Sequence, residues 1–264
     1  MKRALRLTAF CVVLVALWEL LVRLRLWPDY LLPSPLEVCR TLAHNIGNGD
    51  LQRAIGVSLR RILLGFGVTT LAGIAAGIWI ARRRYLEETV GSLVLGLQTL
   101  PSICWFPLAI LWFGLSEFSI LFIVAMGTLF SVISSTVAGV KNVPLLYLRA
   151  GRNMGARGRV LLWEVVLPAA LPSILSGMKQ GWSFAWRSLM AGELLFVNLG
   201  LGHLLNVGRE LNDMNQVLAV VLVILIIGLA VEMGVFGPVE NRLRVRWGLQ
   251  KTIRRRAEDA PAEA

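Results

Sequence analysis

Three ionisable side chains, Lys179, Arg187 and Glu193, occur in an otherwise apolar stretch of the sequence. Placing an ionised group at the centre of a bilayer costs about 2.5–3.5 kcal/mol or more, so such a residue has a function or a partner. An arginine keeps its proton in proteins, and its planar guanidinium can bind an oxyanion through two parallel hydrogen bonds. Arg187 therefore has two interpretations: it binds an anion, or it pairs with an acid such as Glu19 or Glu232 on a neighbouring helix.

Polar residues also interrupt the apolar stretch 89–113, where Gln98, Thr99 and Ser102 surround Pro101. Proline lacks a backbone N–H and can kink a helix, which frees a carbonyl toward a cavity. We expect these residues and Arg187 to lie along a path for a solute across the membrane.

Trp182 and Trp186 share one broad helical face with Glu193, because their spacing follows the helical period. We include all three as candidates for the solute path. The alternative for the tryptophans is packing in the core or against lipid. The alternative for Glu193 is a structural role between helices.

Catalytic motifs are missing from the sequence. There is no G-x-x-x-x-G-K-[ST] stretch to cradle phosphates and no local motif of nucleophile, base and orienting acid. Cys11, Cys39 and Cys104 have no spacing typical of a disulfide framework or a metal site. We expect a protein that is not an enzyme and holds no metal, so the energy for uphill transport has to come from another subunit.

The composition indicates a membrane protein. The chain is 56% hydrophobic and 16% charged, whereas a soluble domain usually carries about 25% charged residues. The first apolar stretch resembles a secretory signal, but no small-residue cleavage site follows it, so we treat it as a retained span. We predict an all-α, polytopic single domain with about six transmembrane helices, over residues 5–26, 60–81, 89–113, 118–140, 174–197 and 216–237. The tail, about 251–264, is expected to be disordered.

Basic residues set the expected orientation. Lys and Arg are concentrated before the first span, after the second, between the fourth and fifth, and after the sixth. Because cytoplasmic loops carry an excess of these residues, we predict that both termini and the loop 141–172 lie in the cytoplasm.

The loop 141–172 is expected to be structured. Pro144 suits the start of a helix, and Gly155 suits the left-handed position that ends one. Gly158 follows, and then "RVLLWEVVL" reads as a second helix that Pro168 interrupts. The sequence therefore predicts a helix, a glycine turn and a helix on the inner face. A structured loop of this kind is better explained by a docking partner than by anchoring to lipid headgroups.

The loop resembles the cytoplasmic motif of permeases in ATP-binding-cassette importers, which has the form E-A-A, three residues, G, nine residues, I-x-L-P. The glutamate place holds Arg149 here, which departs from the motif. The resemblance implies contact with an ATPase subunit for the matching positions and their neighbour, namely Arg149, Ala150, Gly151, Gly155, Ala156, Val165, Leu167 and Pro168.

Other stretches are similar to the branch of these permeases that imports nitrate, taurine and aliphatic sulfonates. They are "LPSPLEV", "SLRRILLGF", "LQTLPSICWFPLAILWFG" and "AGELL". The resemblance implies a multi-pass subunit of the bacterial inner membrane. It also implies two cytoplasmic ATPase subunits, which would hold ATP and Mg²⁺, a second permease subunit in a homodimer, and an extracytoplasmic solute-binding protein. No cofactor is expected in this chain.

Two other classes of protein fit the sequence less well. A self-sufficient secondary transporter or channel for a small anion often contains inverted repeats with matched broken helices, and the sequence shows no matched pair. A membrane-anchored nucleic-acid binder needs a basic soluble domain, which the sequence lacks, so no nucleic acid is expected.

Overall fold

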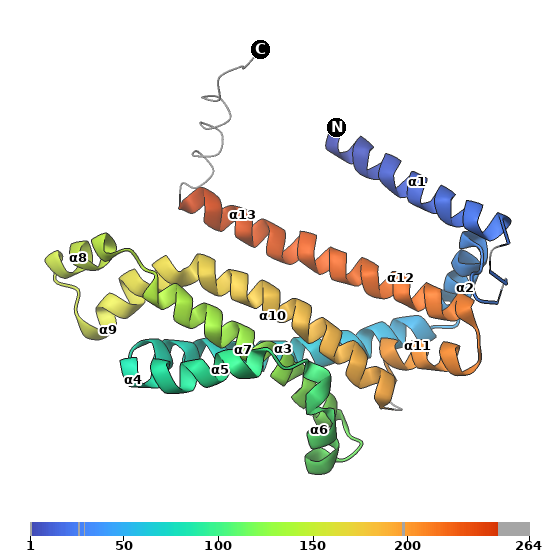
Figure 1. The fold of residues 1–264 in the computed structure, drawn as a ribbon. Helices are drawn as coiled ribbons and strands as arrows, with labels where there is room; N and C mark the ends of the chain where they lie inside the picture. The colour runs from blue at the N-terminus through green and yellow to red at the C-terminus, as the bar shows by residue number, and fades with distance from the viewer. Residues whose placement is uncertain (1, 26, 29, 197–198, 248–264) are drawn as a thin grey trace. The chain divides into compact units, whose positions relative to one another are not determined.

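A computed structural model describes residues 2–25, 27–28, 30–196 and 199–247 (Figure 1). Every regular element in those ranges is a helix, which confirms the predicted all-α class. The tail predicted to be disordered, 251–264, lies outside the described residues. Backbone contacts divide the chain into two units, Met1–Arg61 with Met190–Ile227, and Ile62–Leu189 with Gly228–Ala264.

In the described residues, four helical stretches are long and apolar enough to cross a membrane. They are α3 (Asp50–Ala81), α7 (Glu117–Lys141), the continuous helical stretch Gly158–Leu195, and Met214–Arg246. A bent pair, Arg84–Gln98 with Ser102–Phe113, makes a fifth if it forms one span. The first predicted span corresponds to α1 (Lys2–Arg23), and the count of six stays a prediction.

The first unit contains α1, α2 (Pro35–Gly47), the start of α3, α11 (Leu201–Glu210) and most of α12 (Met214–Val231). The entry to α2 is a capping box, in which the Ser34 hydroxyl accepts from the Glu37 N–H and the Glu37 carboxylate accepts from the Ser34 N–H. This exchange satisfies two N–H groups that a helix start leaves unpaired. The Trp18 indole N–H donates to the Pro33 carbonyl at 3.1 Å and so connects α1 to this turn.

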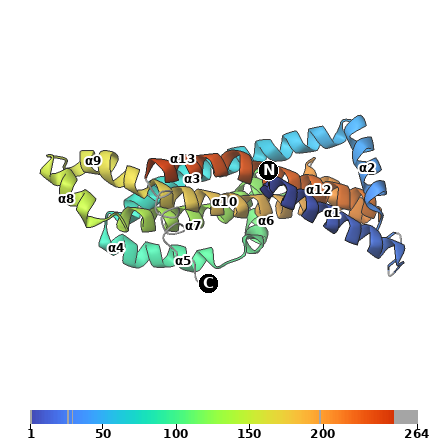
Figure 2. The ribbon, with the colours of Figure 1, turned by 90° about the horizontal axis from the view of Figure 1, so that it is seen from above.

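The second unit is built on close helix contacts at small residues. A Cβ at Gly77 would lie 2.6 Å from the Cβ of Thr136, so α3 approaches α7 closely at the G-x-x-x-G motif of residues 73–77. Small residues at such a motif allow two helices of a membrane protein to pack closely. On another face of α7, a Cβ at Gly177 would lie 2.3 Å from the Cβ of Ser135 in α10 (Leu167–Leu195). Both views of the ribbon show α7 and α10 side by side (Figures 1 and 2).

The predicted third span is broken in the middle. Its first part comprises α4 (Arg84–Leu86), the π-helical turn η1 (Glu87–Gly91) and α5 (Ser92–Gln98), and its second part comprises η2 (Ser102–Trp105) and α6 (Phe106–Phe113). The two parts meet at 102°, and Figure 1 shows α6 turned away from α5. Pro101 has an extended conformation with no N–H to donate, which confirms the predicted interruption.

The loop 141–172 forms a helix, a turn and a helix, as predicted. α8 (Leu145–Asn153) ends where the Gly155 N–H donates to the Arg152 carbonyl and the Ala156 N–H to the Gly151 carbonyl. These two bonds define a Schellman motif, which requires a left-handed residue, and Gly155 has φ +90°. After the turn, α9 (Gly158–Leu161) leads through the π-helical turn η3 (Leu162–Val166) into α10.

The predicted interruption at Pro168 is wrong. The helix continues through this residue and through Pro172 as far as Leu195. A proline ring normally clashes with the carbonyl four residues earlier, and the wider π turn η3 directly before Pro168 shifts the hydrogen bonds to a spacing of five residues. The final span shows a similar arrangement, because the π turn η4 (Glu232–Phe236) precedes α13 (Gly237–Arg246), which has Pro238 in its first turn.

Candidate functional site

A cavity of about 280 Å³ lies in the second unit at the break between α5 and η2. The break supplies Gln98, Thr99 and Ser102, and α10 supplies Arg187. The structure therefore brings together four of the polar residues that the sequence places on a solute path. We call this space the Arg187 cavity. The sequence did not identify its remaining walls, which include Met126, Gly127 and Phe130 from α7 and Phe184 from α10.

The broken helix fixes the polar groups of the cavity. The Thr99 hydroxyl donates to the Gly96 carbonyl at 2.7 Å, which satisfies an oxygen that the interrupted helix leaves without its usual partner. The Ser134 hydroxyl of α7 donates to the Gln98 Oε1 at 2.8 Å. With its oxygen engaged in this way, the Gln98 amide has its two N–H groups left as donors.

Arg187 brings a permanent positive charge to the cavity. Its Nε–H donates to the Ser183 carbonyl at 3.1 Å, and its Cζ lies 4.9 Å from the centre of the Phe184 ring. Among the described residues, Arg187 forms no ion pair and no further hydrogen bond. The guanidinium therefore has its Nη donors left for a bound group, and the aromatic ring supports it through a cation–π contact.

Neither acid considered as a partner for Arg187 pairs with it. Glu232 lies 2.5 Å from the Nζ of Lys179, and Glu19 lies 2.8 Å from the Nε of Arg23, four residues away on the same helix. Lys179 is also 3.5 Å from Glu240. The two basic residues of α10 thus differ, since Lys179 has acidic partners and Arg187 has none in the described residues.

The tryptophans of α10 do not line the Arg187 cavity. Trp182 and Trp186 stack with their ring centres 6.4 Å apart, and both are buried. Trp182 also meets Phe66 edge to face at 5.2 Å and lies 6.2 Å from Phe236. The structure places both residues in an aromatic core between helices of the second unit, which corresponds to the packing alternative.

Glu193 lies in the first unit, where it is fully buried. Its carboxylate accepts from the Ser58 hydroxyl at 2.7 and 2.9 Å, from Arg61 Nη1 at 3.0 Å and from the Gly202 N–H at 3.0 Å. Arg61 also donates to the Leu199 carbonyl at 2.7 Å. Glu193 is thus the centre of an internal network, which corresponds to the structural alternative.

The network caps a helix. The N–H groups of Leu201 and Gly202 are the first two of α11, and they donate to Ser58 and Glu193. A carboxylate at a helix N-terminus satisfies unpaired N–H groups and lies at the positive end of the helix dipole. A Cβ at Gly200 would lie 2.5 Å from the Glu193 carboxyl carbon, so the approach of this segment requires a glycine.

Ser58 and Arg61 were missed from the sequence. Arg61 lies at the edge of the predicted span 60–81, next to the uncharged run that begins at Ile62, and was not identified as a site residue. In the structure α3 starts at Asp50, so Arg61 lies three turns into the helix and its side chain is 5% exposed. A signal was present, because Ser58 and Arg61 are three residues apart and therefore share a helical face.

The loop 141–172 exposes apolar side chains beside its basic ones. Leu146, Met154 and Trp163 are 72%, 87% and 67% exposed. Gly151 is buried against the second helix, since a Cβ there would lie 2.9 Å from Val165. Ala156, Val165, Leu167 and Pro168 are half-buried, and Arg149, Ala150 and Gly155 are exposed. An exposed apolar surface held rigidly by a close-packed glycine is typical of a docking site.

The chain is similar to several known proteins. The model of a family described as the inner membrane component of binding-protein-dependent transport systems matches residues 73–236, which include the loop and the Arg187 cavity. The taurine transport system permease protein of Escherichia coli is 31% identical over 84% of this chain and 82% of that protein. The riboflavin transport system permease protein of Chloroflexus aurantiacus is 28% identical over 92% and 90%. The nitrate import permease protein of a Synechocystis strain is 24% identical over 83% and 82%.

Proposed function

The chain belongs to the inner membrane components of binding-protein-dependent transport systems, and on that premise we propose that it passes a small anionic solute through the Arg187 cavity. It is a multi-pass permease subunit in the branch of ATP-binding-cassette importers whose members include the taurine and nitrate permeases. The riboflavin relative carries a different kind of solute. The preference for an anion therefore rests on the chemistry of the cavity.

The observation that supports an anion is the guanidinium of Arg187. A permanent charge inside an apolar helix requires a counter-charge, water or a ligand, and the described residues supply no acid. An oxyanion can accept two parallel hydrogen bonds from a guanidinium. The Gln98 amide and the Ser102 hydroxyl add neutral donors at the same cavity. A sulfonate or nitrate group fits this set of donors, whereas a cation does not.

The loop 141–172 is proposed as the coupling site for two cytoplasmic ATPase subunits. Its exposed Leu146, Met154 and Trp163 supply the apolar contact, and the neighbouring arginines favour an acidic rim on the partner. ATP and Mg²⁺ would be held by those subunits. A homodimer of permease chains and an extracytoplasmic solute-binding protein complete the proposed assembly.

Substitution of Arg187 tests the solute. We expect Arg187→Met to lower uptake of labelled taurine or nitrate by about tenfold or more in vesicles containing the complete complex, because hydrogen bonds to a charged group contribute about 1.5–3 kcal/mol. Arg187→Lys should retain part of the uptake, since it keeps the charge and loses the planar geometry. Assembly and basal ATP hydrolysis should survive in both variants.

The matched control is Arg209→Met, which removes an exposed arginine of α11 that lies outside the cavity. This variant should transport like the unmodified complex. Unchanged uptake of both anions by Arg187→Met, with normal assembly, would contradict the proposal.

A further inference from the structure

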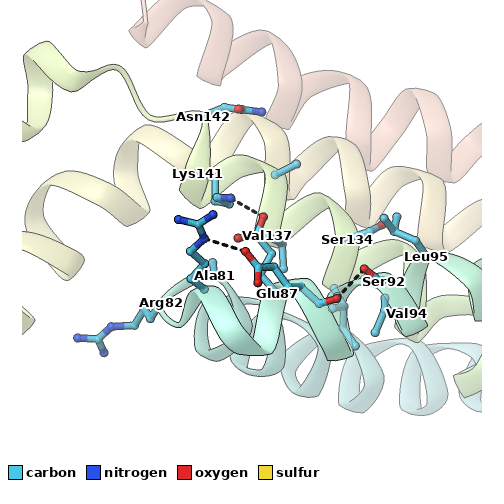
Figure 3. Close-up of a pocket in the computed structure, with 15 residues that line it drawn as sticks. Ala81, Arg82, Glu87, Ser92, Val94, Leu95, Ser134, Val137, Lys141 and Asn142 are labelled. Atoms are coloured by element: carbon cyan, nitrogen blue, oxygen red, sulfur yellow. Dashed lines mark hydrogen bonds and ion pairs between the residues drawn. The ribbon is translucent and has the colours of Figure 1, made fainter.

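A second, larger cavity of about 1,090 Å³ lies between α5 and the last third of α7 (Figure 3). We call it the α5–α7 cavity. Its walls combine apolar residues such as Val94, Ile133 and Val137 with the charged residues Glu87 and Lys141. The cavity leaves part of α5 without packing partners on α7, so the contacts that do join the two helices determine how α5 is held.

Two polar contacts join α5 and its preceding π turn to α7. At one end, Glu87 of η1 forms an ion pair with Lys141, the last residue of α7, as the dashed line in Figure 3 marks. At the other end, Gln98 accepts from Ser134 at 2.8 Å. Between them, Val90, Val94 and Leu97 pack on the cluster of Ile80, Phe130 and Ile133. The segment is thus a short rod, about 16 Å long at 1.5 Å per residue, attached at both ends.

The Gln98 end of this rod lies at the Arg187 cavity. Gln98 and the two residues that follow it line that cavity directly. A change in the position of the rod would therefore move donor groups that face the proposed solute.

The Lys141 end of the rod adjoins the coupling loop. Lys141 is followed by Asn142, Val143 and Pro144, after which α8 begins. Val143 is 6% exposed and forms a buried cluster with Ala170 and Ile174 of α10, against which Leu148 of α8 also packs. The end of α7, the first helix of the loop and the start of α10 are therefore one packed body, and Lys141 is attached to it.

Glu87 belongs to an element that departs from regular helix. It is the first residue of the π turn η1, and π turns are frequent at functional sites. The Ser92 hydroxyl donates to the Glu88 carbonyl at 2.9 Å and the Thr89 hydroxyl to the Tyr85 carbonyl at 2.7 Å. Side-chain hydroxyls thus satisfy carbonyls around the irregular turn, and the turn can persist without breaking the helix.

We propose that the Glu87–Lys141 ion pair transmits the position of the coupling loop to α5, and thereby sets how far the Arg187 cavity is open. The pair acts as a positioning contact and does not touch the solute. This proposal rests on the proposed function of the Arg187 cavity and of the loop. It assigns the link between them to one cross-helix ion pair in a part of the chain that packing leaves open.

The test measures access to the Arg187 cavity and needs no knowledge of the solute. Ser102→Cys is introduced in a chain whose three native cysteines are replaced by serine, and the complete complex is placed in vesicles. The labelling rate with the small anion 2-sulfonatoethyl methanethiosulfonate is measured without nucleotide and with ATP plus vanadate. The ratio of the faster to the slower labelling rate reports how strongly the ATPase subunits control access to the cavity.

We expect this ratio to fall by about two- to fivefold in Glu87→Gln and in Lys141→Met, which is the shift that a partly exposed ion pair can produce in an equilibrium. The two effects should not add in the double variant, because both remove the same contact. The reversed pair Glu87→Lys with Lys141→Glu should recover part of the ratio. Recovery is incomplete because a glutamate at the C-terminus of α7 is disfavoured by the helix dipole.

The matched control is the neighbouring ion pair of Arg84 and Glu88, at 2.7 Å, which borders the same cavity but joins two residues of one helical segment. Arg84→Met and Glu88→Gln should leave the ratio unchanged. A ratio that is unchanged in Glu87→Gln and Lys141→Met, while Arg187→Met still lowers anion uptake, would overturn the link alone. A ratio of one in the complex that carries only Ser102→Cys, with Glu87 and Lys141 both intact, would overturn the link together with the proposed solute path.

Discussion

The charged residues Lys179, Arg187 and Glu193 of α10 differ in how their charges are neutralised. Lys179 has Glu232 and Glu240, Glu193 has Arg61 and the N-terminus of α11, and Arg187 has an aromatic ring and a backbone carbonyl. The first two have acquired fixed partners, so their charges contribute to the architecture. The third retains donors for a ligand, which is the physical basis for separating the proposed site from the structural pairs.

The Glu193 network should be a determinant of stability. Glu193→Gln removes the buried carboxylate that pairs with Arg61, and removing one partner of a buried ion pair costs about 3–5 kcal/mol. We expect a marked fall in the midpoint of thermal unfolding in detergent. The double variant Arg61→Met with Glu193→Met should be less destabilised than the two single variants together, because no buried charge is left unpaired.

A matched control for this experiment is Glu19→Gln, which removes one partner of the exposed pair with Arg23. Its effect on the unfolding midpoint should be small, since exposed pairs contribute about 0–1 kcal/mol. Strictly additive effects of Arg61→Met and Glu193→Met would show that the two residues are not energetically coupled.

At the scale of elements, the coupling loop depends on the turn at Gly155. Its φ of +90° is a conformation that a β-branched residue does not tolerate, and the resulting local strain is about 1–3 kcal/mol. Gly155→Val should therefore disturb the relation of α8 to α9 without unfolding the membrane helices. We expect an inserted protein with lost transport and weakened association with the ATPase subunits, measured by co-purification and by uptake.

Gly49 provides the control, because it has φ +80° in the turn between α2 and α3, outside the coupling loop. Gly49→Val imposes a similar backbone strain there and should leave association with the ATPase subunits intact. Normal transport by Gly155→Val would count against the coupling role of the loop.

At the scale of the whole molecule, the orientation in the membrane is the property to test. In a chain without native cysteines, Leu211→Cys should react with an impermeant thiol reagent added outside intact cells, since Leu211 is 70% exposed and precedes the last span. Arg157→Cys in the coupling loop should react only after the cells are opened. The physical reason is the excess of basic residues on one side of the spans.

Labelling of position 157 in sealed cells would contradict the predicted orientation. It would place the coupling loop outside the cell, where it could not contact a cytoplasmic ATPase. Reaction of both positions after lysis confirms that each cysteine is reachable, so a negative result in sealed cells reports on the membrane and not on local burial.

The sequence by itself determined the features that depend on local chemistry. Apolar runs predicted helices that match α3, α7 and the last two spans, because a bilayer requires internally hydrogen-bonded segments of sufficient length. Gly155 predicted the left-handed end of α8, and Pro101 predicted the break in the third span. The loop motif and the neighbouring stretches indicated the family, which the comparison with known proteins shows.

Only the tertiary structure decided which polar residues meet. It brought Arg187 to Gln98 and Ser102 across different helices, separated Trp182 and Trp186 from that cavity, and gave Glu193 its partners Ser58 and Arg61. It also carried the helix through Pro168 by means of a π turn. Sequence periodicity assigns a residue to a face of its own helix, but the neighbour of that face depends on packing between helices far apart in the chain, where close contacts at glycines such as Gly77 and Gly177 set the distances.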